Sequence, residues 1–158
     1  MKRVYTDVLT IFPKSINKYL YSVTITDSYL RTRWVKHLKA KSNCFKVFTA
    51  WTVMVEEKTG LKVLFIRCDS GGEYDNEAFK AWAQRNGKTF ERTAPHTSSQ
   101  NGVAERYNGV LMDAVRAIMC HFNVPKDFWD YAMDHANTVL NMMPCKTLGE
   151  IFHLHLDW

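Results

Sequence analysis

The apolar segment 61–68 constrains the fold of this chain most strongly. Gly60 precedes it and a Ser-Gly-Gly turn at 70–72 follows it. A compact apolar run between turn residues is typical of a buried strand. The preceding region, up to Gly60, carries apolar residues at helical spacing, and a strand that is reached through a helix usually pairs in parallel. The segment therefore predicts an α/β architecture.

The rest of the chain alternates in the same way. Residues 4–8, 19–26 and 31–38 are rich in β-formers, and a helix is predicted from Ser42 or Asn43 to Gly60. Asp75 or Asn76 can cap a second helix that Gly87 ends, and 88–94 follows as a short strand. A turn-forming loop at 95–102 precedes a long helix, and a last helix runs from Pro125 to Pro144. This order predicts an α/β domain with a mixed central β-sheet and helices on both faces.

The two C-terminal helices are recognised by their apolar stripes. The stripe of the first comprises Ala104, Tyr107, Leu111, Val115, Ile118 and Phe122. The stripe of the second comprises Phe128, Ala132, Ala136, Val139 and Met143. Trp51, Trp82 and Trp129 also fall on apolar stripes and are interpreted as core residues.

Composition restricts the function classes. The 158 residues suit one domain, and the longest aliphatic and aromatic run, 63–66, is far too short for a membrane span of about 20 residues. Residues 1–50 hold ten Lys and Arg against two Asp, a net charge of +8, which favours an anionic partner. Four cysteines without a C-x-x-C pair indicate neither a disulfide framework nor a zinc ribbon. No secretion signal is recognised, so an intracellular protein is expected.

Three carboxylates stand where a ligand site of an α/β sheet would lie. Asp7 is in the first strand, Asp69 ends the most buried strand, and Glu105 is near the start of the long helix. Clustered carboxylates repel one another unless a cation lies between them, and oxygen ligands suit Mg²⁺ or Mn²⁺. Two such ions can align an in-line displacement at a phosphodiester. Spacing alone is weak support, because sixteen acidic residues permit many triplets.

The residues around these acids carry a more specific signal. Thirty-five residues separate Asp69 from Glu105, and the flanks are Cys-Asp-Ser-Gly-Gly-Glu-Tyr at 68–74 and Gln-Asn-Gly-Val-Ala-Glu-Arg-Tyr-Asn at 100–108. They resemble the second and third acidic motifs of the integrase core of copia-type retrotransposons. Thr-Asp-Val at 6–8, the stretch 21–34 and Asn-Val-Pro-Lys-Asp-Phe-Trp at 123–129 also resemble family counterparts in order and spacing.

The resemblance covers nearly the whole chain. It implies the three-layer RNase H-like fold and a metal-dependent polynucleotidyl transferase with Asp7, Asp69 and Glu105 as catalytic metal ligands. It further implies two bound Mg²⁺ or Mn²⁺ ions and DNA partners, namely element ends and target DNA. It also implies a homo-oligomer, no association with a membrane, and a nuclear location. Family members carry a zinc module before the first Asp and a further C-terminal region, so residues 1–158 are expected to be the isolated catalytic core.

Several residues have two interpretations. Asp27 is an alternative first ligand, although the family places that ligand on the first strand, and a structural or surface role suits Asp27 better. Asn101 and Gly102 are expected to form a turn that aims the Glu105 helix, with a positive φ at Gly102. Gln100 and Asn101 are equally plausible DNA contacts.

The expectation of DNA binding involves two arginines, Arg106 and Arg116, and one glycine, Gly109. Arg106 and Arg116 are candidate phosphate contacts, although an intramolecular ion pair suits Arg116 at least as well. The family usually has a basic residue where this chain has Gly109.

Two rival functions remain open. Gly109 motivates a catalytically inactive nucleic-acid-binding remnant of a retrotransposon polyprotein. A ribonuclease of the same fold that cuts RNA–DNA hybrids is disfavoured by the spacing from Asp69 to Glu105 and by the sequence around Glu105.

Overall fold

A five-stranded mixed sheet forms the centre of the computed structural model, which describes residues 2–68, 74, 76–92 and 98–144. Its strands are β1 (Arg3–Thr10), β2 (Tyr21–Asp27), β3 (Arg33–Leu38), β4 (Phe65–Cys68) and β5 (Thr89–Arg92), in the order β3-β2-β1-β4-β5. β1, β2 and β3 are antiparallel, whereas β4 runs parallel to β1 and to β5. The predicted mixed sheet is confirmed, including the parallel pairing of the strand that ends at Cys68.

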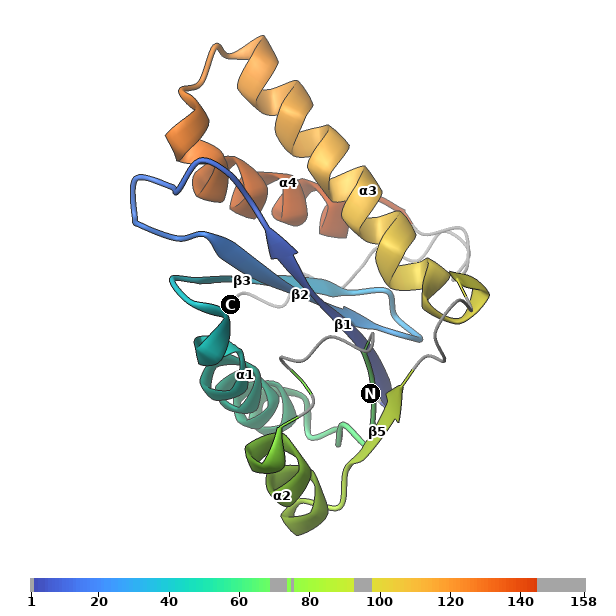
Figure 1. The fold of residues 1–158 in the computed structure, drawn as a ribbon. Helices are drawn as coiled ribbons and strands as arrows, with labels where there is room; N and C mark the ends of the chain where they lie inside the picture. Colours follow the sequence, from blue (N-terminus) through green and yellow to red (C-terminus); the bar gives the residue numbers. More distant parts are fainter. Residues whose placement is uncertain (1, 69–73, 75, 93–97, 145–158) are drawn as a thin grey trace.

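Helices cover both faces of this sheet (Figure 1). One face carries α1 (Cys44–Thr59) and α2 (Glu77–Arg85), and the other carries α3 (Ser98–His121) and α4 (Trp129–Met142). Short 3-10 turns, η1 (Lys41–Asn43) and η2 (Lys126–Phe128), precede α1 and α4. The result is the predicted three-layer α/β fold. No helix in the described ranges is long and apolar enough to cross a bilayer.

Local sequence signals explain three of the helix ends. The side chain of Asn76 accepts a hydrogen bond from Phe79 N at 3.0 Å, so Asn76 is the N-cap of α2. Gly60 ends α1 with a φ of 68°, a left-handed conformation that glycine adopts without a Cβ clash. Gly87, with a φ of 61°, follows the end of α2.

Two separate cores lie on the two sides of the sheet. The α1–α2 core consists of Val4, Val23, Ile25, Trp34, Leu38, Cys44, Phe48, Trp51, Val55, Val63, Ile66, Cys68, Tyr74 and Phe79. The α3–α4 core consists of Ile11, Val35, Tyr107, Leu111, Val115, Trp129, Ala132, Met133 and Ala136. The core interpretation is confirmed for Trp51 and Trp129, and Trp82 packs partly buried against the α1–α2 core.

The prediction for the start of α3 was wrong. Asn101 and Gly102 lie inside the helix, which begins at Ser98, and they form no sharp turn. Gly102 does not have a positive φ, whereas Gly60 and Gly87 do. The carbonyl of Gly102 accepts a hydrogen bond from Arg106 Nε at 2.8 Å, as a helical carbonyl can. The turn-forming composition of 95–102 concealed a helical N-terminus because serine and asparagine favour both turns and first helical turns.

The stripe of α4 also differs from the prediction. Val139 is 42% exposed, and Met143 lies beyond the end of the helix. The buried positions begin at Trp129 and continue through Ala132, Met133 and Ala136, a spacing of three and four residues. On α3, Phe122 lies just past the last helical residue and is 69% exposed. Phe122 and Met143 lie beyond the helix ends, where the predicted stripes were extended too far, whereas Val139 lies on an exposed side of α4.

Candidate metal and nucleic-acid site

Asp7 lies on β1, the central strand, and its side chain points to the α3–α4 side of the sheet. Its Oδ2 accepts a hydrogen bond of 2.7 Å from Asn108 Nδ2 of α3, and its Oδ1 accepts one of 2.8 Å from Val8 N. The two carboxylate oxygens are therefore held by donors from α3 and from β1 itself. Central position and two-sided support fix the orientation of this carboxylate.

Asn108 links the helix to the sheet. It is only 7% exposed, and its Oδ1 is buried without a hydrogen-bond donor among the described residues. Because Nδ2 donates to Asp7, the amide is oriented by the carboxylate rather than by a bond to Oδ1. A buried polar side chain with one atom that makes no hydrogen bond is tolerated in folded proteins mainly where another interaction holds the side chain in place.

Glu105 lies on the same helix as Asn108. It precedes Asn108 by three residues on α3, and side chains at that helical spacing are neighbours about 5–6 Å apart at Cβ. Glu105 is exposed, whereas Asn108 is buried. Glu105 thus lies on the helix that contacts Asp7, three residues before Asn108.

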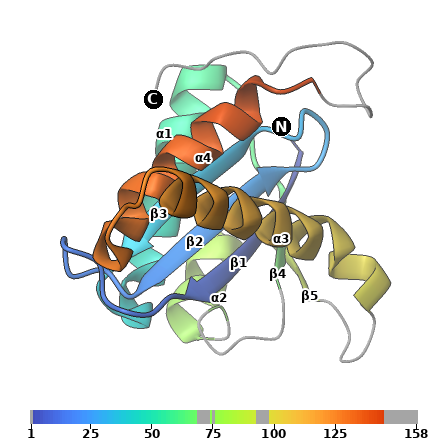
Figure 2. The same cartoon turned by 90° about the horizontal axis from the view of Figure 1, so that it is seen from above.

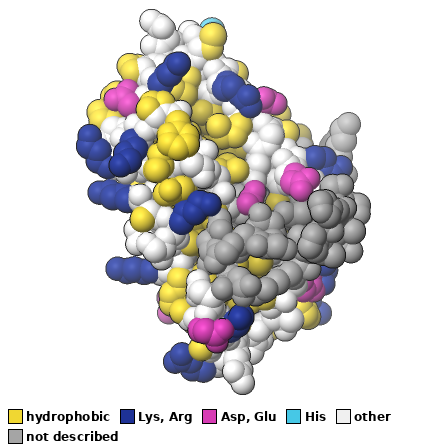
Figure 3. All heavy atoms as spheres, in the orientation of Figure 1, with side chains coloured by type: hydrophobic (Ala, Val, Ile, Leu, Met, Phe, Trp, Pro, Cys, Tyr) yellow, Lys and Arg dark blue, Asp and Glu magenta, His cyan; other side chains and the backbone are white. Residues whose placement is uncertain are grey.

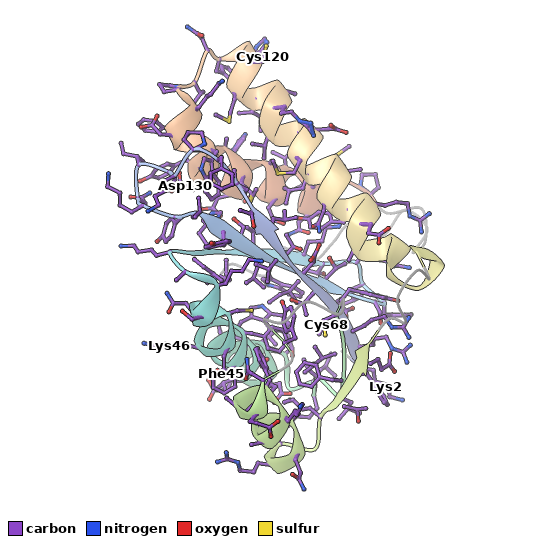
Figure 4. All side chains as sticks on the ribbon, viewed as in Figure 1. Lys2, Phe45, Lys46, Cys68, Cys120 and Asp130 are labelled. Carbon is purple, nitrogen blue, oxygen red and sulfur yellow. The ribbon has the colours of Figure 1, made fainter. Side chains whose placement is uncertain are left out.

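The end of β4 lies beside the strand of Asp7. Cys68, labelled in Figure 4, is the last residue of β4; it pairs with Thr6 and is fully buried. Asp69 follows Cys68 but lies outside the described residues.

Tyr74 anchors the chain beyond that point. Its hydroxyl and that of Thr6 lie 2.7 Å apart in the α1–α2 core. Burial, with a contribution from nearby Cys44, raises the pKa of Tyr74 well above its ordinary value, so the hydroxyl stays neutral.

The donor chemistry of the two described acids suits a hard divalent cation. Asp7 and Glu105 offer carboxylate oxygens, the ligands that Mg²⁺ and Mn²⁺ prefer. No group of three or more His, Cys, Asp or Glu that could hold a metal occurs within the described residues. The third predicted ligand, Asp69, is outside that part of the chain.

Known proteins resemble the chain in sequence. The Pol polyprotein of transposon TNT 1-94 from Nicotiana tabacum is 38% identical over 149 residues, covering 92% of this chain and 11% of the polyprotein. The truncated transposon Ty1-A Gag-Pol polyprotein of Saccharomyces cerevisiae is 30% identical over 133 residues, covering 83% of this chain and 11% of that protein. The chain thus spans about a tenth of the length of these relatives. No protein-family model matches it.

Solved structures resemble it in fold. The integrase catalytic core domain of HTLV-2, in complex with magnesium, aligns with a TM-score of 0.67 at 19% identity, covering 96% of this chain and 95% of that one. The chain belongs to the integrase cores of copia-type retrotransposons. The simian T-cell lymphotropic virus intasome in complex with a PP2A regulatory subunit aligns with a TM-score of 0.74 at 17% identity, covering 96% of this chain and 52% of that one. This integrase core thus has the RNase H-like fold.

Asp27 of the integrase core has a different environment from Asp7. It pairs with Val4, so its side chain shares the face of Val4, opposite to that of Asp7. It is fully buried, and its Oδ2 accepts hydrogen bonds from the backbone N–H groups of Tyr29 (3.2 Å) and Leu30 (2.7 Å). The carboxylate therefore orders the β2–β3 turn, as the structural interpretation expected, and the surface interpretation was wrong.

The four predicted DNA-binding residues all lie on α3 of the integrase core. Gln100 and Asn101 occupy its first turn, but their side chains fall outside the described residues. Arg106 is exposed and donates from Nε to Gly102 O. Arg116 forms the local ion pair considered from the sequence, at 3.2 Å to Asp113, and both side chains are largely exposed. Such an exposed pair contributes little to stability and can exchange for another anion.

Positively charged side chains gather on one edge of the integrase core (Figure 3). In the view of Figure 3, Lys and Arg side chains gather along the left edge, over the β1–β2 connection and the start of α1. Lys14, Lys18, Lys39 and Lys41 are exposed in these segments. This distribution reflects the positive charge concentrated in the first fifty residues.

Sequence reasoning singled out the acids but missed Asn108 as their support. A signal was present: Asn108 follows Glu105 by three residues, which places the two on one side of a helix. Tyr74 was likewise quoted only as part of a motif. Its role depends on the contact with Thr6, which no local pattern reveals.

Proposed function

We propose that this integrase core carries out metal-dependent polynucleotidyl transfer in DNA integration, comprising 3′-end processing and strand transfer. Asp7, Asp69 and Glu105 are the proposed catalytic metal ligands. The observation that carries the proposal is the 2.7 Å hydrogen bond from Asn108 to Asp7, because it connects the helix of Glu105 to the strand of Asp7. Two carboxylates from distant sequence positions are thereby held on one side of the sheet.

The chain's own residues have distinct roles in this proposal. Asp7 is presented on a rigid central strand, and Asn108 and Val8 N orient its two oxygens. Glu105 presents its carboxylate from the exposed edge of α3. When bound, two Mg²⁺ or Mn²⁺ ions would supply Lewis-acid activation of the phosphodiester and of the attacking oxygen. The magnesium in the complex of the HTLV-2 core supports the choice of metal.

The proposed partners are DNA and further copies of the chain. Gln100, Asn101, Arg106 and Arg116 are proposed to contact element-end or target DNA, since all four lie on the helix that carries Glu105. The HTLV-2 catalytic core has dimeric and trimeric forms, which supports the proposal of a homo-oligomer.

The test is an assay of strand transfer or its reversal on branched DNA with Mn²⁺. This assay measures catalytic turnover and does not require other domains. Asp7→Asn and Glu105→Gln are expected to abolish turnover, since each removes one carboxylate charge. Asp27→Asn makes the same chemical change on the opposite face and is expected to retain much of the activity. Loss of activity with Asp27→Asn but not with Asp7→Asn would reassign the first ligand.

The second candidate function is an inactive nucleic-acid-binding remnant. Gly109 favours it, because this exposed α3 position lacks the basic residue that the family usually has. DNA binding without turnover by the wild-type chain, over a range of Mn²⁺ and Mg²⁺ concentrations, would support the remnant and contradict catalysis.

A further inference from the structure

The sheet carries a cationic surface one row away from Asp7. Tyr5 of β1 pairs with Arg67 of β4, and Arg67 pairs with Glu91 of β5. Residues paired across neighbouring strands point to the same face, and so do residues two positions apart on one strand. Tyr5, Arg67 and Glu91 therefore share the face of Asp7, about 7 Å before it along β1. Arg3, two further residues back, is on that face as well. We call Arg3, Tyr5, Arg67 and Glu91 the arginine face.

The helices leave this surface open on their side of the sheet. The main contacts of α3 are with β1, β2 and α4, and those of α4 are with α3 and β3. In Figure 2, neither helix lies over the first residues of β1. The side chains of Arg3 and Arg67 are 38% and 24% exposed, and neither Tyr5 nor Phe65 belongs to either core.

Contacts within the arginine face hold its two guanidinium groups next to each other. Glu91 accepts from Arg3 Nη2 at 2.8 Å through one oxygen, and from Arg67 Nη2 at 2.8 Å and Nε at 3.2 Å through the other. The Arg3 guanidinium also lies over the Phe65 ring, and that of Arg67 over the Tyr5 ring. These contacts fix like charges side by side, an arrangement that would otherwise be repulsive.

The four residues of the arginine face carry a net positive charge, because two are arginines and one is a glutamate. Lys2 is exposed at the start of β1 (Figure 4). The Nε–H of Arg3 has no acceptor among the described residues although it is buried. An ordered guanidinium group with an unmet donor, as in Arg3, suits an oxyanion such as a phosphate.

We propose that the arginine face binds the phosphate backbone of the DNA strand whose phosphodiester is presented to Asp7. This inference rests on the proposed function, because it takes DNA as the partner. Arg67 lies about 8 Å from Asp7 by strand geometry, within the reach of a long side chain toward a neighbouring phosphate. Arg3 extends the same line away from the site. The arginine face thus sets the path of the strand, and Glu91 keeps its two arginines ordered before DNA arrives.

The test measures DNA binding by the full chain in EDTA, so that turnover plays no part. The probe is a fluorescently labelled duplex with a single-stranded 3′ end, titrated at several salt concentrations. Arg3→Gln combined with Arg67→Gln is expected to weaken binding about tenfold and to reduce the slope of log affinity against log salt by about 2. The matched control is Arg85→Gln, an exposed arginine of α2 on the opposite layer. A double variant that binds like this control would overturn the proposal.

Two further measurements separate charge from folding. Glu91→Gln keeps both arginines and an amide oxygen that can accept from them, but removes a negative charge. Affinity is therefore expected to stay equal or rise, and a loss as large as that of the double variant would overturn the proposal. In the wild-type chain, DNA is expected to protect Arg3 and Arg67, but not Arg85, from dicarbonyl modification followed by mass spectrometry. Equal modification with and without DNA would also overturn it. A wild-type chain that binds no DNA contradicts the proposed function itself, whereas binding that is insensitive to the arginine face contradicts this inference alone.

Discussion

Replacing Asn108 by alanine removes the donor that joins α3 to β1. A net hydrogen bond to a charged group contributes about 1.5–3 kcal/mol. The same change also removes the buried Oδ1 that has no donor, which offsets part of the loss. We therefore expect Asn108→Ala to lower the free energy of unfolding by about 1–2 kcal/mol, and the melting temperature by about 2–8 °C for a domain of this size.

Calorimetry at low salt, combined with a double-mutant cycle, checks this prediction. In an Asp7→Ala background the carboxylate is absent, so Asn108→Ala is expected to cost less than about 0.5 kcal/mol. The control is Asn86→Ala. This change removes an exposed hydrogen bond from the side-chain amide of Asn86 to the carbonyl of Trp82, and it is expected to have a smaller effect. If Asn108→Ala costs the same with and without the Asp7 carboxylate, the hydrogen bond does not support the site.

Three other predictions concern single positions. Glu56→Gln should cost about 3 kcal/mol near neutral pH, because it leaves the buried Lys88 ammonium without its anion. Burial raises the pKa of Glu56, but hydrogen bonds from Lys88, Val63 N and Lys62 outweigh this and lower it below 4.5, so the contribution is present above pH 4.5 and lost as the pH falls through the lowered pKa. Melting curves of both proteins at several pH values should therefore converge in acid. Gly109→Arg should raise the melting temperature by about 2–4 °C and tighten DNA binding, because no atom lies within 4 Å of the added Cβ and glycine disfavours a helix by about 1 kcal/mol. Mg²⁺ at ten times its dissociation constant should add about 1.4 kcal/mol to wild-type stability, and Asp7→Asn should abolish this shift in calorimetry.

Local chemistry made most of the fold predictable. Gly60, Asn76 and Gly87 each act at a single backbone position, so residue identity alone indicates where helices begin and end. The apolar run before Asp69 also predicted a buried strand, although β4 starts only at Phe65. The four residues before it form a connection in which Val63 is buried and its N–H donates to Glu56. Burial of a side chain therefore did not require strand pairing.

The rest depended on contacts between distant segments. Residues 98–102 have the composition of a turn, yet they are helical, and propensity alone cannot separate these two states for serine and asparagine. The pairing of Asn108 with Asp7 spans 101 residues, and that of Tyr74 with Thr6 spans 68. Sequence patterns with periods of two to four residues carry no information at such separations, so the site's supports emerged only from the structure.

The two halves of the proposed site have unequal mechanical support. β1 is the central strand and is bonded on both edges, so exposing Asp7 by unpairing would require nearly global unfolding. The α3–α4 layer packs on the sheet through the α3–α4 core, and detaching it would break the Asn108 bond without separating any strands. Hydrogen exchange should accordingly be slow in β1 and faster in α3. On heating, the integrase core should lose the alignment of Glu105 with Asp7 before it loses its sheet, so inactivation would precede the loss of β-structure.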